Sequence, residues 1–189
     1  MAPDPRQRSF RAVLINTFVA NITTSFLWFA VTFWMYLETR NVLVTSILGG
    51  SYMLGMAIFG VPFGSWIDRT RKKRVMVISQ GVTAAFFAAA ALVYFLATPA
   101  QVLRIGSPAF VLFIVFLLVG AVMESARGIA LSTVVTLLIP DAERARANGL
   151  VGMVTGLSFM VTSVIAGLAI GRLGMTLSLV IALALTVFS

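Results

Sequence analysis

The stretch that decides the fold is the short polar run GSWIDRTRKKR, residues 64–74, which lies between two long apolar segments. It holds five of the chain's fourteen Lys and Arg residues, next to one of its six acidic residues. Basic loops that join membrane-spanning helices are retained on the cytoplasmic side of the bilayer. The run therefore predicts a loop that fixes how the neighbouring helices cross a membrane.

The composition agrees with a membrane protein. Of the 189 residues, 60% are hydrophobic and 11% charged, with a mean hydropathy of +1.03; soluble domains carry about twice that charged fraction. Six apolar segments are long enough, or nearly so, to cross a hydrocarbon core of about 30 Å. They are residues 10–37, 42–67, 75–97, 108–139, 149–171 and 173–189. We therefore predict an all-α membrane protein, with a single transmembrane domain over residues 1–189 and a cytoplasmic tail at 1–9.

The sixth segment is the shortest, and the chain stops inside it. We expect from this that the chain is half of a longer protein, or a half that works in pairs.

The loop charges predict an orientation in the membrane. Ten basic residues fall on the side of the N-terminus and the second and fourth loops: Arg6, Arg8, Arg11, Arg69, Arg71, Lys72, Lys73, Arg74, Arg144 and Arg146. Three fall on the other side: Arg40, Arg104 and Arg172. The positive-inside rule places the first set in the cytoplasm of a cell whose plasma (inner) membrane holds the chain. Trp28, Phe29, Phe33, Trp34 and Tyr36 then crowd the outer half of the first span, as an interfacial aromatic belt would.

Several classes of function are disfavoured by the residues present. The net charge of +8 is spread over short loops and forms no basic face, so we expect no nucleic-acid partner. The chain has no Cys and no His, which argues against a metal site, and neither Lys follows the Gly that a phosphate-binding loop needs. No pair of carboxylates suggests an enzyme, and no cofactor is expected.

The run 64–74 resembles the signature of the loop between the second and third helices in the major facilitator superfamily. Gly64, Asp68, Arg69, Lys72 and Lys73 stand at its Gly, Asp, basic and paired basic positions, and Arg71 replaces a second Gly. Residues 139–149, IPDAERARANG, also resemble the loop between helices four and five of drug/proton antiporter-type exporters.

The resemblance implies one lobe of six transmembrane helices, built as two inverted three-helix repeats. It also implies that Asp68 braces this lobe against a second six-helix lobe, which is a missing C-terminal half or a second copy. In a simpler interpretation, the basic cluster only sets the topology.

Glu124 and Arg127 lie three residues apart near the middle of the fourth segment, so they share one helix face. A charge at that depth costs about 2.5–3.5 kcal/mol on insertion scales, so such residues face protein or a water-filled cavity. Glu124 is a candidate proton carrier or counter-ion for a cationic substrate, with Arg127 tuning it. The pair could instead neutralise itself and lock helix packing.

The first span has Asn21, Thr24, Ser25 and Trp28 on one face. We take Asn21 and Trp28 as candidate cavity residues, with an interhelical hydrogen bond as the other role for Asn21. Tyr52, Met56 and Phe159 could extend an apolar lining, or pack in the core. Glycines four residues apart, at 60/64, 152/156 and 167/171, predict close helix contacts.

The function these features favour is proton-coupled efflux of amphipathic small molecules by alternating access. Two alternatives stay open: uptake of a small polar solute, and a non-transporting orphan half or assembly partner.

Overall fold

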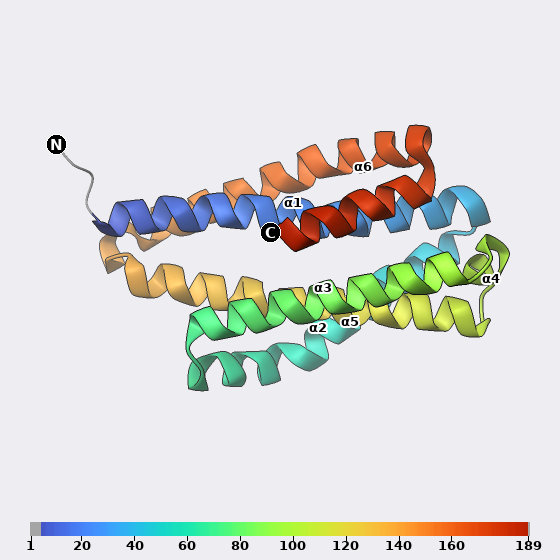
Figure 1. Ribbon diagram of the computed structural model, residues 1–189. Helices are drawn as coiled ribbons and strands as arrows, with labels where there is room; N and C mark the ends of the chain where they lie inside the picture. The colour runs from blue at the N-terminus through green and yellow to red at the C-terminus, as the bar shows by residue number, and fades with distance from the viewer. Residues whose placement is uncertain (1–4, 189) are drawn as a thin grey trace.

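The computed structural model describes residues 5–188, with the side chains of residues 10, 12, 14–134 and 139–186, and this part of the chain is almost wholly helical (Figure 1). The elements are α1 (Pro5–Thr39), α2 (Val42–Arg69), α3 (Lys72–Leu96), α4 (Pro99–Leu103), α5 (Pro108–Leu138), η1 (Asp141–Glu143) and α6 (Arg144–Phe188). Residues 1–4 of the predicted tail lie outside the described part, and α1 already begins at Pro5.

Five helices in the described part are long and apolar enough to cross a membrane. The segments predicted at 42–67, 75–97 and 108–139 correspond to α2, α3 and α5. The predicted segments 149–171 and 173–189 fall in α6 as far as Phe188, the last described residue, and α6 contains non-helical backbone at Gly174 (φ 74°, ψ 179°). The chain turns back on itself there, at the far right of Figure 1. A left-handed φ with this ψ is open essentially only to glycine, so Gly174 permits the reversal.

The connections lie at two opposite ends of the bundle (Figure 1). The start of α1, the α2–α3 connection and the α5–α6 connection share one end; the α1–α2 turn, α4 and Gly174 share the other. The short helix α4 was not predicted. Its capping box, in which Thr98 and Gln101 exchange side-chain and backbone hydrogen bonds, explains why it forms.

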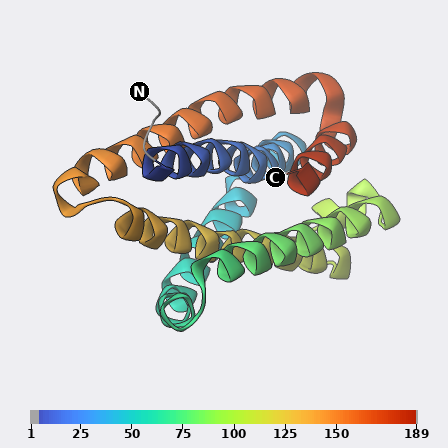
Figure 2. The same ribbon diagram turned by 60° about the vertical axis from the view of Figure 1, so that its left-hand side comes forward.

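The helices form two layers (Figure 2). α1 packs along α6 in one layer and α3 along α5 in the other, while α2 lies mainly against α5. α2 is the least covered of the spans: Met53 is 73% exposed and Val61 80%. Its apolar residues therefore face outward, toward lipid or another protein surface.

Of the six glycines in the predicted pairs, only Gly167 meets a neighbouring helix, with Phe33 Cε2 of α1 3.6 Å from a Cβ built on it. Nothing lies within 4 Å of a Cβ built on Gly60, Gly64, Gly152, Gly156 or Gly171. A Cβ on Gly120 of α5, in contrast, would lie 2.6 Å from Cε1 of Phe87 in α3. The prediction from four-residue spacing was therefore wrong for five of the six glycines, because close approach depends on which side chains the facing helix presents.

The aromatic residues of α1 do not form the predicted belt. Trp34 is 5% exposed and makes edge contacts with Tyr94 and Phe113, at ring-centroid distances of 5.4 and 6.3 Å. Trp28 lines a half-open cavity, and among the five predicted belt residues only Tyr36 is well exposed, at 42%. α1 is central to the bundle, so its C-terminal half is covered by α3, α5 and α6 side chains rather than by lipid.

Candidate functional site

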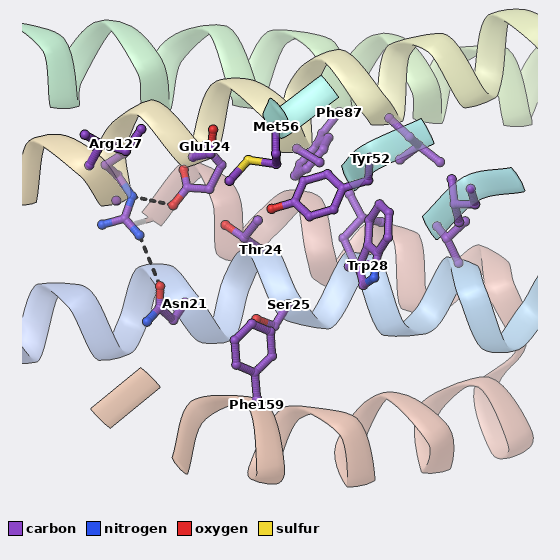
Figure 3. A pocket seen from close by; sticks show the side chains of 18 of the residues that line it. Asn21, Thr24, Ser25, Trp28, Tyr52, Met56, Phe87, Glu124, Arg127 and Phe159 are labelled. Atoms are coloured by element: carbon purple, nitrogen blue, oxygen red, sulfur yellow. Dashed lines mark hydrogen bonds and ion pairs between the residues drawn. The ribbon is translucent and has the colours of Figure 1, made fainter. Parts of the chain in front are cut away.

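A cavity of about 450 Å³ lies between the two layers of helices (Figure 3). Its wall comes mostly from α1, α2 and α5, with Phe87 from α3 and Phe159 from α6. One apolar core, around Phe113 and Trp34, and a second, around Ile67 and Val75, pack the bundle on either side of it. The volume is within the range of small-molecule pockets, about 300–1,000 Å³.

The only formally charged residues on the described wall are Glu124 and Arg127 of α5. The Arg127 Nε donates to Glu124 Oε1, and the two side chains are 5% and 11% exposed, Arg127 first. Their spacing of one helical turn brings both to the same face of α5, turned toward α1 (Figure 3). The ion pair compensates two charges that neither an apolar core nor lipid would tolerate alone.

A second hydrogen bond joins this pair to α1 and α6. The Arg127 Nη2 donates to Asn21 Oδ1 at 3.3 Å, and the Asn21 Nδ2 donates to Thr155 Oγ1 at 3.2 Å. Arginine can only donate, so Asn21 must turn its carbonyl oxygen to Arg127 and its amide nitrogen to Thr155. The four residues thus form one polar chain that joins three helices, near the middle of α1, of α5 and of the arm of α6 that precedes Gly174.

Two atoms of the ion pair have no hydrogen-bond partner in the described part of the chain: Glu124 Oε2 and Arg127 Nη1, both buried. A buried polar atom without a partner raises the free energy of the state that contains it. A bound proton, water molecule or ligand group that paired with either atom would therefore lower the free energy of the site.

The rest of the wall is aromatic and apolar. The rings of Trp28 and Tyr52 lie 5.0 Å apart at 48°, with Met56 close to Tyr52 (Figure 3). Phe159 of α6 also lines the cavity, but it lies apart from these rings, next to Ser25. The hydroxyl of Thr24 donates to the backbone of its own helix, as does that of Ser125. Such a wall suits a molecule with a ring and few polar groups.

The basic run 64–74 contributes no residue to this wall and lies at the end of α2 and the start of α3. The Lys72 Nζ donates to Ile67 O at 2.9 Å and to Asp68 O at 3.5 Å, so its charge caps the negative end of α2. The Asp68 carboxylate is exposed, and it makes no ion pair with any residue that the structure describes. Arg69 and Lys73 are exposed as well, and Gly64 is half-buried on α2.

The structure brings together part of the predicted site. Asn21, Trp28, Glu124 and Arg127 all line the cavity, as do Tyr52, Met56 and Phe159. The loop residues 64–73 form a separate region. Thr155 was missed, because a lone hydroxyl in an apolar helix usually bonds to its own backbone and carries no signal of a longer-range partner.

Comparison with protein families gives a match to the Major Facilitator Superfamily over residues 13–189. No curated protein and no solved structure matches the chain. The matched region covers every membrane-spanning helix described above and nearly the whole chain. The chain is a multi-pass membrane protein and belongs to the major facilitator superfamily of transporters.

Proposed function

We propose that the chain is one lobe of a proton-coupled exporter of amphipathic small molecules that works by alternating access. The single observation that carries this proposal is the Glu124–Arg127 ion pair on the wall of a cavity at the centre of the bundle. Ionisable groups inside a membrane are expensive, and they mark the paths of protons and substrates.

Proton coupling follows from the chemistry of this pair. Glu124 is the only acidic residue on the described wall, so it is the group there that can take up and release a proton. When Glu124 is protonated, the charge of Arg127 is left without its partner. A molecule that displaces water from the cavity favours the state whose charges cancel, so substrate binding should expel the proton.

The proposed lobe has six membrane crossings in two inverted three-helix repeats. The reversal at Gly174 supports it, since it divides α6 into two helical arms that run in opposite directions (Figure 1). In this arrangement α1 and α5 each begin one repeat, and these are the helices that supply Asn21 and the ion pair.

The proposed orientation places the α2–α3 connection in the cytoplasm of a cell whose plasma membrane holds the protein. The supporting feature is the clustering of basic residues at one end of the bundle. At that end the carboxylate of Asp68, which is exposed and has no ion pair within the described part of the chain, is available to a second lobe, either a C-terminal half or a second copy. The oligomeric mass of the purified chain in detergent tests which of these supplies it, since a dimer would favour a second copy and a monomer a separate half.

Transport in proteoliposomes tests the function. A proton gradient should drive uptake of an amphipathic dye into inside-out vesicles, and Glu124→Gln should abolish that coupling while the protein keeps its folded elution profile. Glu38→Gln is the matched control, because Glu38 is exposed at the end of α1 and should leave coupling intact. Equal coupling in Glu124→Gln and the unaltered protein would remove the proton role of Glu124.

A further inference from the structure

The charges on the wall of the central cavity cancel within the protein itself. Glu124 and Arg127 are its only charged residues in the described part of the chain, and they are already paired with each other. The cavity therefore offers a bound molecule no net charge to balance its own.

Arg127 is held so that its charge cannot move out of the cavity wall. Glu124 accepts from its Nε, and Asn21 accepts from its Nη2 at 3.3 Å. Asn21 is fixed in turn by Thr155 on α6, at 3.2 Å. With 5% of its side chain exposed, the guanidinium stays next to the carboxylate.

This arrangement acts against a cationic molecule. A permanent cation must leave its hydration shell to enter an aromatic cavity, and it regains that loss only by pairing with an uncompensated anion. Here the nearest carboxylate carries its own cation, and the guanidinium repels a second one at close range. The rings of Trp28 and Tyr52 attract cations, but by less than a desolvated charge loses.

A neutral molecule meets no such obstacle. Its ring can pack against Trp28 and Tyr52, and its desolvation involves no charge. We infer that the site selects uncharged, ring-bearing amphipathic molecules and discriminates against permanent cations of the same shape. The inference rests on the proposed function for the identity of the site, and it names the class of its substrate.

Equilibrium binding to the purified protein tests the inference without any transport step. Dihydroethidium is neutral, and ethidium is its permanently cationic form with nearly the same shape. We expect the unaltered protein to bind dihydroethidium about tenfold or more tighter than ethidium, measured anaerobically by fluorescence titration. Binding of ethidium as tight as that of dihydroethidium, or binding of neither, would overturn the inference.

A charge-switch variant separates electrostatics from shape. Arg127→Gln leaves Glu124 uncompensated, so the preference should reverse toward ethidium by about tenfold. The double variant Glu124→Gln/Arg127→Gln removes both charges and should restore the preference for dihydroethidium. An unchanged preference in the single variant would overturn the inference, since a merely structural role for Arg127 cannot reverse a charge preference.

Glu124→Gln alone tests the same selection by charge, now with an uncompensated positive charge in the cavity. It is the variant to use if Arg127→Gln does not fold. The uncompensated guanidinium should then favour an anionic dye, 1-anilinonaphthalene-8-sulfonate, over dihydroethidium. Weaker binding of the anion than in the unaltered protein would contradict the rule. Failure of proton-driven transport with an intact binding preference would instead count against the proposed function alone.

Discussion

Replacing Thr155 by Val tests the polar chain that holds the site together. Val keeps the branched shape of Thr but lacks the hydroxyl that accepts from Asn21 Nδ2 at 3.2 Å. Asn21 cannot turn to compensate, because Arg127 only donates and needs the carbonyl oxygen. The amide nitrogen of Asn21 is then left without its acceptor between α1 and α6.

The expected loss of unfolding free energy is about 1 kcal/mol. Hydrogen bonds between membrane helices contribute about 0.6 kcal/mol on average and at most about 1.7 kcal/mol. The cost of a buried donor left alone in a folded protein overlaps the upper part of that range, at about 1–3 kcal/mol. The contact is longer than the usual N–H···O distance of about 2.9 Å, so the upper limits are not expected here.

Unfolding in mixed micelles with increasing sodium dodecyl sulfate measures this loss. Thr155→Ser keeps a hydroxyl and should stay close to the unaltered protein. In an Asn21→Leu background the Thr155→Val change should cost almost nothing, so a double-mutant cycle should give a coupling energy of about 0.6–1 kcal/mol. A coupling energy near zero, or equal losses for Val and Ser, would refute the assigned orientation of Asn21.

Two further predictions concern the helices around the site. Gly120→Ala should destabilise the protein by about 1–3 kcal/mol, because the new Cβ lies 2.6 Å from Phe87 Cε1, whereas Gly81→Ala meets nothing within 4 Å and should be neutral or stabilising in the same unfolding assay. Lys72→Ala should weaken the last turn of α2 by about 0.3–1 kcal/mol, because the Lys72 ammonium caps the final carbonyls of that helix. Faster amide hydrogen exchange in that turn would show the loss. Lys73→Ala is the control and should not speed the exchange, because Lys73 is exposed and caps nothing in the described part. Equal effects within either pair of variants would contradict these assignments.

Much of the fold could be predicted from the apolar runs, because a spanning helix must satisfy its backbone internally and present apolar side chains to lipid. The position of the ion pair could be predicted for the same reason: Glu124 and Arg127 stand out in the middle of an apolar segment, and charge at that depth needs protein or water around it. Asn21 stands out in the first segment in the same way.

What could not be predicted depends on which helix faces which. Whether Trp34 lies at a membrane interface or in the core is decided by α3 and α5, which are distant in sequence. Gly120 packs closely and Gly152 does not, although each lies in an apolar helix, because only Gly120 meets a large side chain on its partner. Thr155 gains its role solely from the register of α6 against α1.

The most direct test of the central claim, that proton and substrate share the Glu124–Arg127 site, is proton release on substrate binding. Purified protein in weakly buffered detergent is titrated with dihydroethidium over a range of pH, and the change in pH is recorded for each molecule bound. We predict release of up to about one proton per molecule for the unaltered protein and for Glu38→Gln, and none for Glu124→Gln. Binding without release in the unaltered protein, or undiminished release in Glu124→Gln, would contradict a shared site.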